Sequence, residues 1–261
     1  MDIAQFLQDS RVTDAIAALK DSIRREPARV DPRVLLFALN CLSGRLDKAV
    51  VDLEAIKSLD AGWVPAAAVY QNLVDAEIQR RGVFAGKLKP LVMGEPEPWI
   101  GWNVQSLALE ADGSAAEALD LRHRAWEAAS EQPCLVDGAG QPWLCDTDRR
   151  LGPVLEAVLD GKYYWIPFGR LARVEIRPIE FLVELVWVPA TITVVTGGEL
   201  HAHLPVRYPG TETQSDERLW LARTTEWGDT AAGTVPFGQK LWETESTDFG
   251  LLTCRTIEFQ R

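Results

Sequence analysis

The stretch RRLGPVLEAVLDGKYYWIPFGRL, Arg149–Leu171, divides the chain into two parts of different character. Its first apolar residues recur at helical spacing and predict a short amphipathic helix over Leu151–Leu159 that stops at Gly161. The aromatic run Tyr163–Trp165 then predicts a strand, which Pro167 closes. We therefore expect a second, strand-rich and tryptophan-rich domain to begin here, after a wholly helical first half.

The helical half, residues 1–130, contains an internal repeat. A set of five positions recurs at a constant interval along the chain, pairing Ser10, Val12, Ala15, Leu19 and Pro27 with Gly44, Leu46, Ala49, Leu53 and Ala61. A period of about 34 residues, with a small residue at the turn and alanine early in the second helix, is typical of tetratricopeptide (TPR) hairpins. Such hairpins bury their apolar faces by stacking, which leaves first helices lining a groove. Asn40 and Tyr70 are the candidate groove residues for binding a partner helix.

A third, less regular copy follows further along the chain, with Gly113, Ala115 and Ala118 at the turn and helix start and Trp102 at the bulky first-helix position. Between the copies we expect a helix over residues 66–81 and a loop over residues 82–98. The loop, rich in glycine and proline, interrupts the stack. The array is therefore TPR-like and irregular.

Beyond a predicted linker at residues 131–142, the chain reads mainly as strands. They are expected at residues 173–176, 182–187, 190–195, 200–206, 219–224 and 251–259, and the third and fourth form a hairpin around Gly197 and Gly198. Only one helix is expected in this half. The predicted fold is thus two-domain: a TPR-like α-α superhelix over residues 1–130, and a tryptophan-rich α+β domain with a largely antiparallel sheet over residues 143–261.

Composition and charge narrow the range of functions. The chain has 261 residues, is 47% hydrophobic and carries a net charge of −11, so nucleic acid and anionic membranes are poor partners. The most apolar run, residues 181–195, is broken by Glu184 and Pro189 and reads as a buried strand pair, not a membrane span. Four scattered cysteines and an acidic N-terminus without an apolar core predict reduced thiols and a cytoplasmic location.

Motifs for phosphate binding, for a nucleophilic serine and for a zinc helix are missing from the sequence, so no cofactor is expected. The sharpest metal-like pattern is His201-x-His203 with Glu199, because these residues share one face of a strand. The alternative, which we favour, is a solvated strand face that alternates with Leu200, Ala202 and Leu204. Asp146 and Asp148 similarly suggest a paired-carboxylate acid–base site, but capping of the predicted helix by Asp148 explains them better.

Two groups of residues are candidates for partner contact in the second half. Arg207 and Tyr208 are of the types enriched at binding hot spots, although Arg207 can instead pair with Glu226 beneath Trp227, the role we favour. Tyr163, Tyr164 and Trp165 alternate along a strand, so at least one face is buried and the other can be offered to a partner.

Five motifs in order along the chain resemble one family. They are VFAGKLKPLVMGEP (Val83–Pro96), DTDRRLGPVLEAVLDGKYYWIPF (Asp146–Phe168), LVWVPA (Leu185–Ala190), RYPGTE (Arg207–Glu212) and ARTTEW (Ala222–Trp227). The family is that of the ImpE/SciE/TagJ accessory proteins of bacterial type VI secretion. Five short motifs in this order are difficult to explain by chance.

The resemblance implies a non-enzymatic adaptor. Family members are held to bind the small contractile-sheath subunit through its N-terminal helix and to connect it with the AAA+ unfoldase that recycles contracted sheath. The alternatives are a metal-assisted hydrolase using His201, His203 and Glu199, and a generic TPR scaffold unrelated to secretion.

Overall fold

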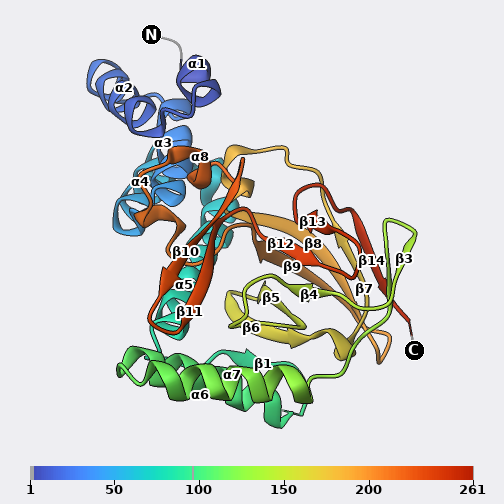
Figure 1. Ribbon diagram of the computed structural model, residues 1–261. Coiled ribbons are helices and arrows are strands. Elements are labelled where there is room, and N and C mark those ends of the chain that lie inside the picture. Colours follow the sequence, from blue (N-terminus) through green and yellow to red (C-terminus); the bar gives the residue numbers. More distant parts are fainter. Residues whose placement is uncertain (1–2, 96, 261) are drawn as a thin grey trace.

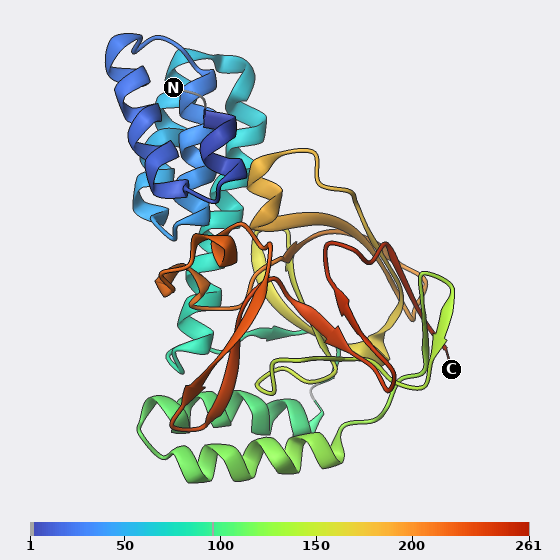
Figure 2. The same cartoon turned by 45° about the horizontal axis from the view of Figure 1, so that its top comes forward.

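The structure, a computed structural model, describes residues 3–95 and 97–260, so Pro96 at the end of the first motif lies outside it (Figure 1). The first half is mainly helical, as predicted, but the loop expected at residues 82–98 contains a strand, β1 (Leu91–Val92), that joins the large sheet. The helices of this half are α1 (Ile3–Gln8), α2 (Val12–Arg25), α3 (Asp31–Leu42), α4 (Leu46–Leu59), α5 (Val64–Phe84), α6 (Pro98–Ala111) and α7 (Ala115–Ala128). Helices α1–α4 lie together at one end of the long α5, and α6 and α7 lie at its other end (Figures 1 and 2).

The internal repeat matches the helix boundaries. Helix α4 begins at Leu46, the repeat counterpart of Val12 where α2 begins, and the two helices have the same length. Helix α7 begins at Ala115, where the third copy predicts a helix start. The small residues Ala15, Ala49 and Ala118 have no exposed surface. The repeat therefore places a small side chain at a buried position near the start of all three helices.

This burial leads to a prediction about stability. Ala49→Leu should lower the free energy of unfolding by about 1–3 kcal/mol, because a larger side chain overpacks a filled helix crossing. Lys48→Leu is the control, since the Lys48 side chain is 64% exposed. Thermal unfolding of both variants tests the assignment, and equal melting temperatures would contradict it.

A large mixed sheet dominates the second half. Its nine strands run in the order β1-β6-β5-β9-β8-β7-β14-β2-β3, in which only β1 and β6 are parallel. The strands are β1 (Leu91–Val92), β2 (Cys134–Val136), β3 (Ala139–Gln141), β5 (Val154–Leu159), β6 (Lys162–Pro167), β7 (Leu171–Ile176), β8 (Trp187–Val194), β9 (Glu199–Pro205) and β14 (Thr256–Phe259). The predicted hairpin around Gly197 and Gly198 is present as β8–β9.

Two smaller sheets complete the molecule. One has the order β13-β12-β4, with β4 at Cys145–Asp146, β12 at Leu241–Glu243 and β13 at Asp248–Gly250. The other is a hairpin of β10 (Thr225–Thr230) and β11 (Gly233–Gly238), which extends beside α5 towards α6 and α7 (Figures 1 and 2).

The predicted helix over residues 151–159 is wrong, because β5 occupies Val154–Leu159. All six residues of β5 are buried, and a strand buried on both faces has an apolar run that helical spacing also fits. The turn that follows β5 is the feature of the sequence that indicates a hairpin instead of a helix. Asp160 and Gly161 both have positive φ, 47° and 74°, and form the two-residue turn of a β5–β6 hairpin.

Other predicted elements also differ. Residues 182–185 form a 3-10 turn instead of a strand, because the Glu184 carboxylate accepts the backbone N–H groups of Glu180 and Phe181. A short helix, α8 (Glu217–Trp220), replaces the strand expected at residues 219–224; Asp216 caps it by accepting the Arg218 N–H. The predicted linker contains β2 and β3, so half of it belongs to the large sheet.

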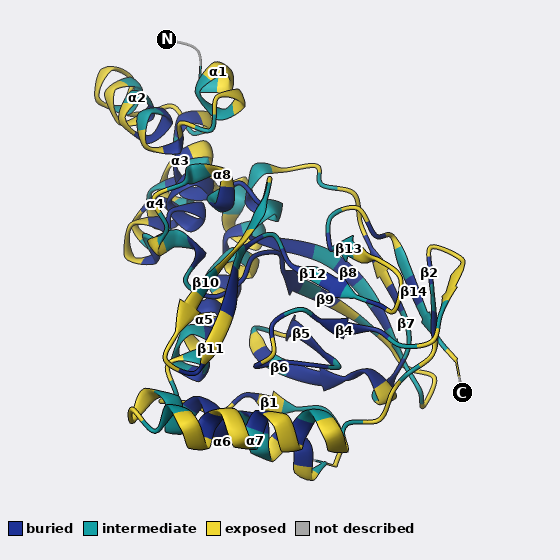
Figure 3. Cartoon of the chain, viewed as in Figure 1, coloured by how far each residue is buried: buried dark blue, intermediate teal, exposed yellow. Residues whose placement is uncertain are grey.

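The large sheet is covered on both faces. One face, including Val154, Val158 and Trp165, packs with the apolar residues of helices α2–α6 in a single core. The other face, including Leu155, Ala157 and Ile166, packs with Trp242, Leu251 and Cys254 in a second core. Buried residues accordingly follow the sheet, while the outer surfaces of α2, α6 and α7 are exposed (Figure 3).

Candidate functional site

Most of the residues expected to contact a partner are buried. Asn40, Tyr163, Trp165 and Tyr208 are each at most 1% exposed, and Arg207 is 7% exposed. Only Tyr70 and Tyr164 are partly exposed. The sequence predicted these residues as partner contacts, but in the folded chain most of them lie in the interior.

Several of these residues meet at a buried ionic cluster between α5 and β5. Glu156, in the middle of β5, accepts hydrogen bonds from Arg80 of α5 at 2.6 and 3.1 Å. The Lys240 ammonium lies 2.7 Å from Glu156 Oε2, which Arg80 also contacts, and 2.5 Å from Asp146 Oδ2. Arg80, Glu156, Lys240 and Asp146 are all at most 3% exposed, so each charge is compensated within the protein interior.

The predicted aromatic residues complete this cluster. The Tyr163 hydroxyl donates to Glu156, and the Trp165 indole N–H donates to the Tyr163 oxygen at 2.6 Å. Tyr208 lies beneath Lys240, with the ammonium 4.9 Å from the ring centre, and its hydroxyl donates to the Leu241 carbonyl. The cluster thus connects the helical half to the sheet through α5.

The ionic cluster changes the pKa values of its members in opposite directions. Burial alone would raise the pKa of Glu156, but the charges of Arg80 and Lys240 outweigh it and hold that pKa well below its usual value. For Asp146 burial wins over the attraction of Lys240 and raises the pKa to about 6. Burial also raises the pKa of Tyr163 and Tyr208 well above the usual value, so both rings stay neutral.

Arg207 has a different role from either one predicted. Its guanidinium donates to the carbonyls of Leu42 and Cys41, at 2.6 and 3.4 Å, which lie at the C-terminal end of α3. Carbonyls there have no partner within the helix and carry the negative end of its dipole. Glu226, the expected partner of Arg207, lies instead 3.6 Å from Arg218. Arg207 therefore fastens the RYPGTE turn to the helical half.

Neither carboxylate of the Asp146-x-Asp148 pair is free for acid–base chemistry. Both oxygens of Asp148 bind Arg150, and its side chain also accepts the Arg150 backbone N–H, so it stabilises a turn and not the start of a helix. Asp146 binds Lys240 and accepts the Asp148 N–H at 2.8 Å. The pair is part of the folded framework.

Glu199, His201 and His203 alternate with inward-facing residues of β9, as expected. Glu199 and His201 are exposed, His203 is partly buried, and Ala202 and Leu204 lie in the core. Burial lowers the pKa of His203. Within residues 3–95 and 97–260, no group of three or more histidine, cysteine, aspartate or glutamate side chains is arranged to hold a metal ion.

The four cysteines are free and buried. Burial raises the pKa of Cys134 to about 11 and of Cys145 and Cys254 to about 12, so these thiols stay protonated at neutral pH.

In the part of the chain that the structure describes, no helix has the length and apolar character needed to cross a membrane.

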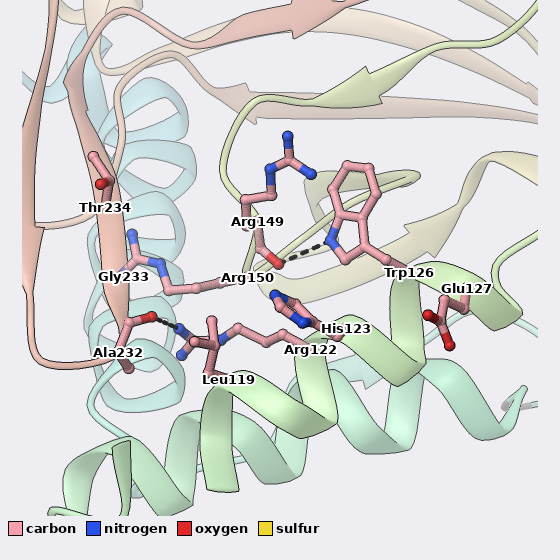
Figure 4. Close-up of a pocket in the computed structure, with 10 residues that line it drawn as sticks. All are labelled: Leu119, Arg122, His123, Trp126, Glu127, Arg149, Arg150, Ala232, Gly233 and Thr234. Atoms are coloured by element: carbon pink, nitrogen blue, oxygen red, sulfur yellow. Dashed lines mark hydrogen bonds between the residues drawn. The ribbon is translucent and has the colours of Figure 1, made fainter. Parts of the chain in front are cut away.

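Besides a cavity of about 660 Å³ between residues 86–92 and α6, two cavities lie at opposite ends of α5. The first, of about 460 Å³, opens between α1, α2 and α3, and its lining includes Ile3, Ala18 and Leu35. The second, of about 450 Å³, lies between α7 and the β10–β11 hairpin tip, and its lining includes His123, Trp126 and Arg149 (Figure 4). Since the predicted residues are largely buried, these cavities are the candidate binding sites.

Comparison with solved structures identifies the fold. The chain superposes over its whole length on 98% of the X-ray structure of protein VPA1032 from Vibrio parahaemolyticus, with a TM-score of 0.92 and 21% sequence identity. At this identity the likeness shows that the arrangement of helices and sheets is shared. The two-part architecture is therefore an established fold.

Comparison of sequences identifies the family. The model of the family described as ImpE protein matches residues 138–258. The type VI secretion system accessory component TagJ of Pseudomonas aeruginosa is 36% identical over 256 residues, which cover 98% of this chain and 90% of that protein. The chain belongs to the ImpE family.

Proposed function

We propose that this protein is a non-enzymatic accessory component of a type VI secretion system, an adaptor that binds the small contractile-sheath subunit through its N-terminal helix. The observation that carries the proposal is the 36% identity to TagJ across nearly the whole chain. The adaptor would also link the sheath subunit to the AAA+ unfoldase, as the family resemblance implies.

The cavity between α1, α2 and α3 supports binding of a helix. Its apolar lining comes from Ile3, Ala18, Leu19, Pro32 and Leu35, and charged residues of both signs, Asp21, Arg25, Arg29 and Asp31, surround it. An amphipathic helix places apolar anchors in such a groove and polar residues at its rim. This cavity takes the place of the groove predicted at Asn40, whose side-chain amide donates to Asp52 in the interior.

The proposal makes a prediction about affinity. Leu35→Glu should weaken binding of the sheath subunit's N-terminal helix about tenfold or more, because it puts a charge where an apolar anchor would lie. Leu35 is 38% exposed, so the variant should fold. Leu59→Glu is the matched control, since Leu59 is 41% exposed at the end of α4 and outside the cavity.

Calorimetric titration of the full chain with a synthetic helix of the sheath subunit measures both variants. Binding of the intact sheath subunit but not of one lacking its first helix would support the proposal. Equal affinity of the Leu35→Glu and Leu59→Glu variants would show that the helix binds outside this cavity. Equal binding of an unrelated amphipathic helix would favour a generic helical scaffold.

A further inference from the structure

The second cavity is part of a longer groove between α7, the Arg149–Arg150 segment and the β10–β11 hairpin tip. Leu119, His123, Trp126 and Glu127 share one face of this helix and line the cavity. A neighbouring cavity of about 480 Å³ also includes Trp126 and Glu127, and it continues to Trp143, Leu144 and Pro153. We call the two cavities together the α7 groove. It runs from the tip of the β10–β11 hairpin to the chain before β4.

The walls of the α7 groove are held by buried arginines. Arg122 donates to the Ala232 carbonyl in the hairpin tip at 3.0 Å (Figure 4). It also donates to Ser106 at 3.1 Å and forms an ion pair with Glu110. Arg150 is bound by both oxygens of Asp148. Because these two guanidinium groups are already paired, they shape the groove without offering a charge to a ligand.

Arg149 differs from both. Its guanidinium lies 4.6 Å from the centre of the Trp126 ring, and the Trp126 indole N–H donates to the Arg149 carbonyl at 3.2 Å. Among the residues that the structure describes, no carboxylate forms an ion pair with Arg149. The guanidinium therefore lies against an indole with no carboxylate of the described residues in direct contact, although Glu127 and Glu131 also line the groove.

The chemistry of the lining indicates what the groove can bind. A guanidinium stacked on an aromatic ring keeps its N–H edge available to a carboxylate, which it can bind through two hydrogen bonds. His123 also lines the cavity, and Glu127 lies on the other side of Trp126 from Arg149 (Figure 4). Trp126, Trp143, Leu144 and Pro153 offer apolar surface to neighbouring side chains.

We propose that the α7 groove binds an acidic peptide segment of a partner protein, with a carboxylate on Arg149 and apolar side chains on the tryptophan-lined floor. This site goes beyond the proposed function, because it lies at the opposite end of α5 from the α1–α3 cavity (Figures 1 and 2). The two sites can be occupied together, so the protein can hold two segments apart.

The test uses the full chain and a short fluorescein-labelled peptide rich in glutamate and leucine. Fluorescence anisotropy should show binding of this peptide, and binding about tenfold weaker for its glutamine counterpart, since a hydrogen bond to a charged group is lost. Arg149→Gln should weaken binding of the glutamate peptide to a similar extent. Arg177→Gln, at an exposed position after β7, makes the same charge change and should leave affinity unchanged.

A second measurement locates the site. In ¹H–¹⁵N spectra the Trp126 indole resonance should shift with the glutamate peptide, and Leu35→Glu should not affect that shift. Equal affinity for the glutamate and glutamine peptides, or no effect of Arg149→Gln, would overturn the proposal. It would also be overturned if inorganic phosphate or a single-stranded oligonucleotide shifted the Trp126 resonance while the peptide did not.

Discussion

Replacing Glu156 by glutamine is expected to lower the free energy of unfolding by about 3–5 kcal/mol, because two buried cations lose their shared counter-charge. Arg80 and Lys240 both lie within 2.7 Å of this carboxylate, whose side chain is 1% exposed. The matched control is Glu258→Gln. Glu258 is 45% exposed and pairs with Arg173 at 3.1 Å, so its loss should cost about 0–1 kcal/mol. Chemical denaturation of both variants measures the difference.

Glu156→Gln should also change how the stability of the folded chain depends on pH in the acid range. Since the pKa of Glu156 is lower in the folded chain than its usual 4.5, its stabilising contribution is complete above that pH and is lost as the pH falls further. Asp146 acts in the opposite direction, because its pKa of about 6 lies above its usual 3.8, so the cost of keeping it ionised in the folded chain is relieved as the pH falls through 6. Below pH 4.5 the melting temperature of the parent should therefore approach that of Glu156→Gln. A constant difference between the two at every pH would contradict this role.

Gly238→Ala is expected to cost about 3 kcal/mol or more, from both backbone strain and a steric clash. Gly238 has φ of +91°, and a Cβ atom there would overlap the Thr224 carbonyl oxygen. The glycine also accepts the Tyr208 N–H and donates to Thr211, so displacing it would disturb the RYPGTE turn.

The variant Gly197→Ala separates the cost of backbone strain from the cost of the steric clash. Gly197 has almost the same φ, +92°, but nothing lies within 4 Å of its Cβ position. Its variant should therefore show only the cost of the left-handed backbone. Equal losses of stability in the two glycine variants would remove the steric argument.

The sequence predicted elements best where a periodic pattern and a specific turn agreed. The internal repeat located α2 and α4, and two glycines located the β8–β9 hairpin with His201 outside and Ala202 inside. The pattern failed at β5, because an apolar run fits both a helix and a strand that is covered on both faces. There the local turn, Asp160-Gly161, was the better evidence.

The candidate site was less predictable, because burial depends on which elements meet in the folded chain. Tyr163, Trp165 and Arg207 are residue types that serve equally well at an interface and in a buried polar cluster. The position of Glu156 in the sequence does indicate a buried ion pair. A single carboxylate within the run VLEAVL is costly to bury without a partner, so it implied cations from elsewhere in the chain. The distant Arg80 and Lys240 could not be assigned to it from spacing alone.

The position of β14 has a consequence for synthesis of the protein on the ribosome. Strand β14, at Thr256–Phe259, lies between β7 and β2 in the large sheet, so it joins the β2–β3 hairpin to the other strands. During translation the helices can pack as they emerge, but the sheet lacks this connecting strand until residues 256–259 leave the exit tunnel. Until then the facing edges of β7 and β2 have no strand to pair with. Because unpaired strand edges can pair with other chains, we expect nascent chains that stall before residue 256 to need protection from aggregation.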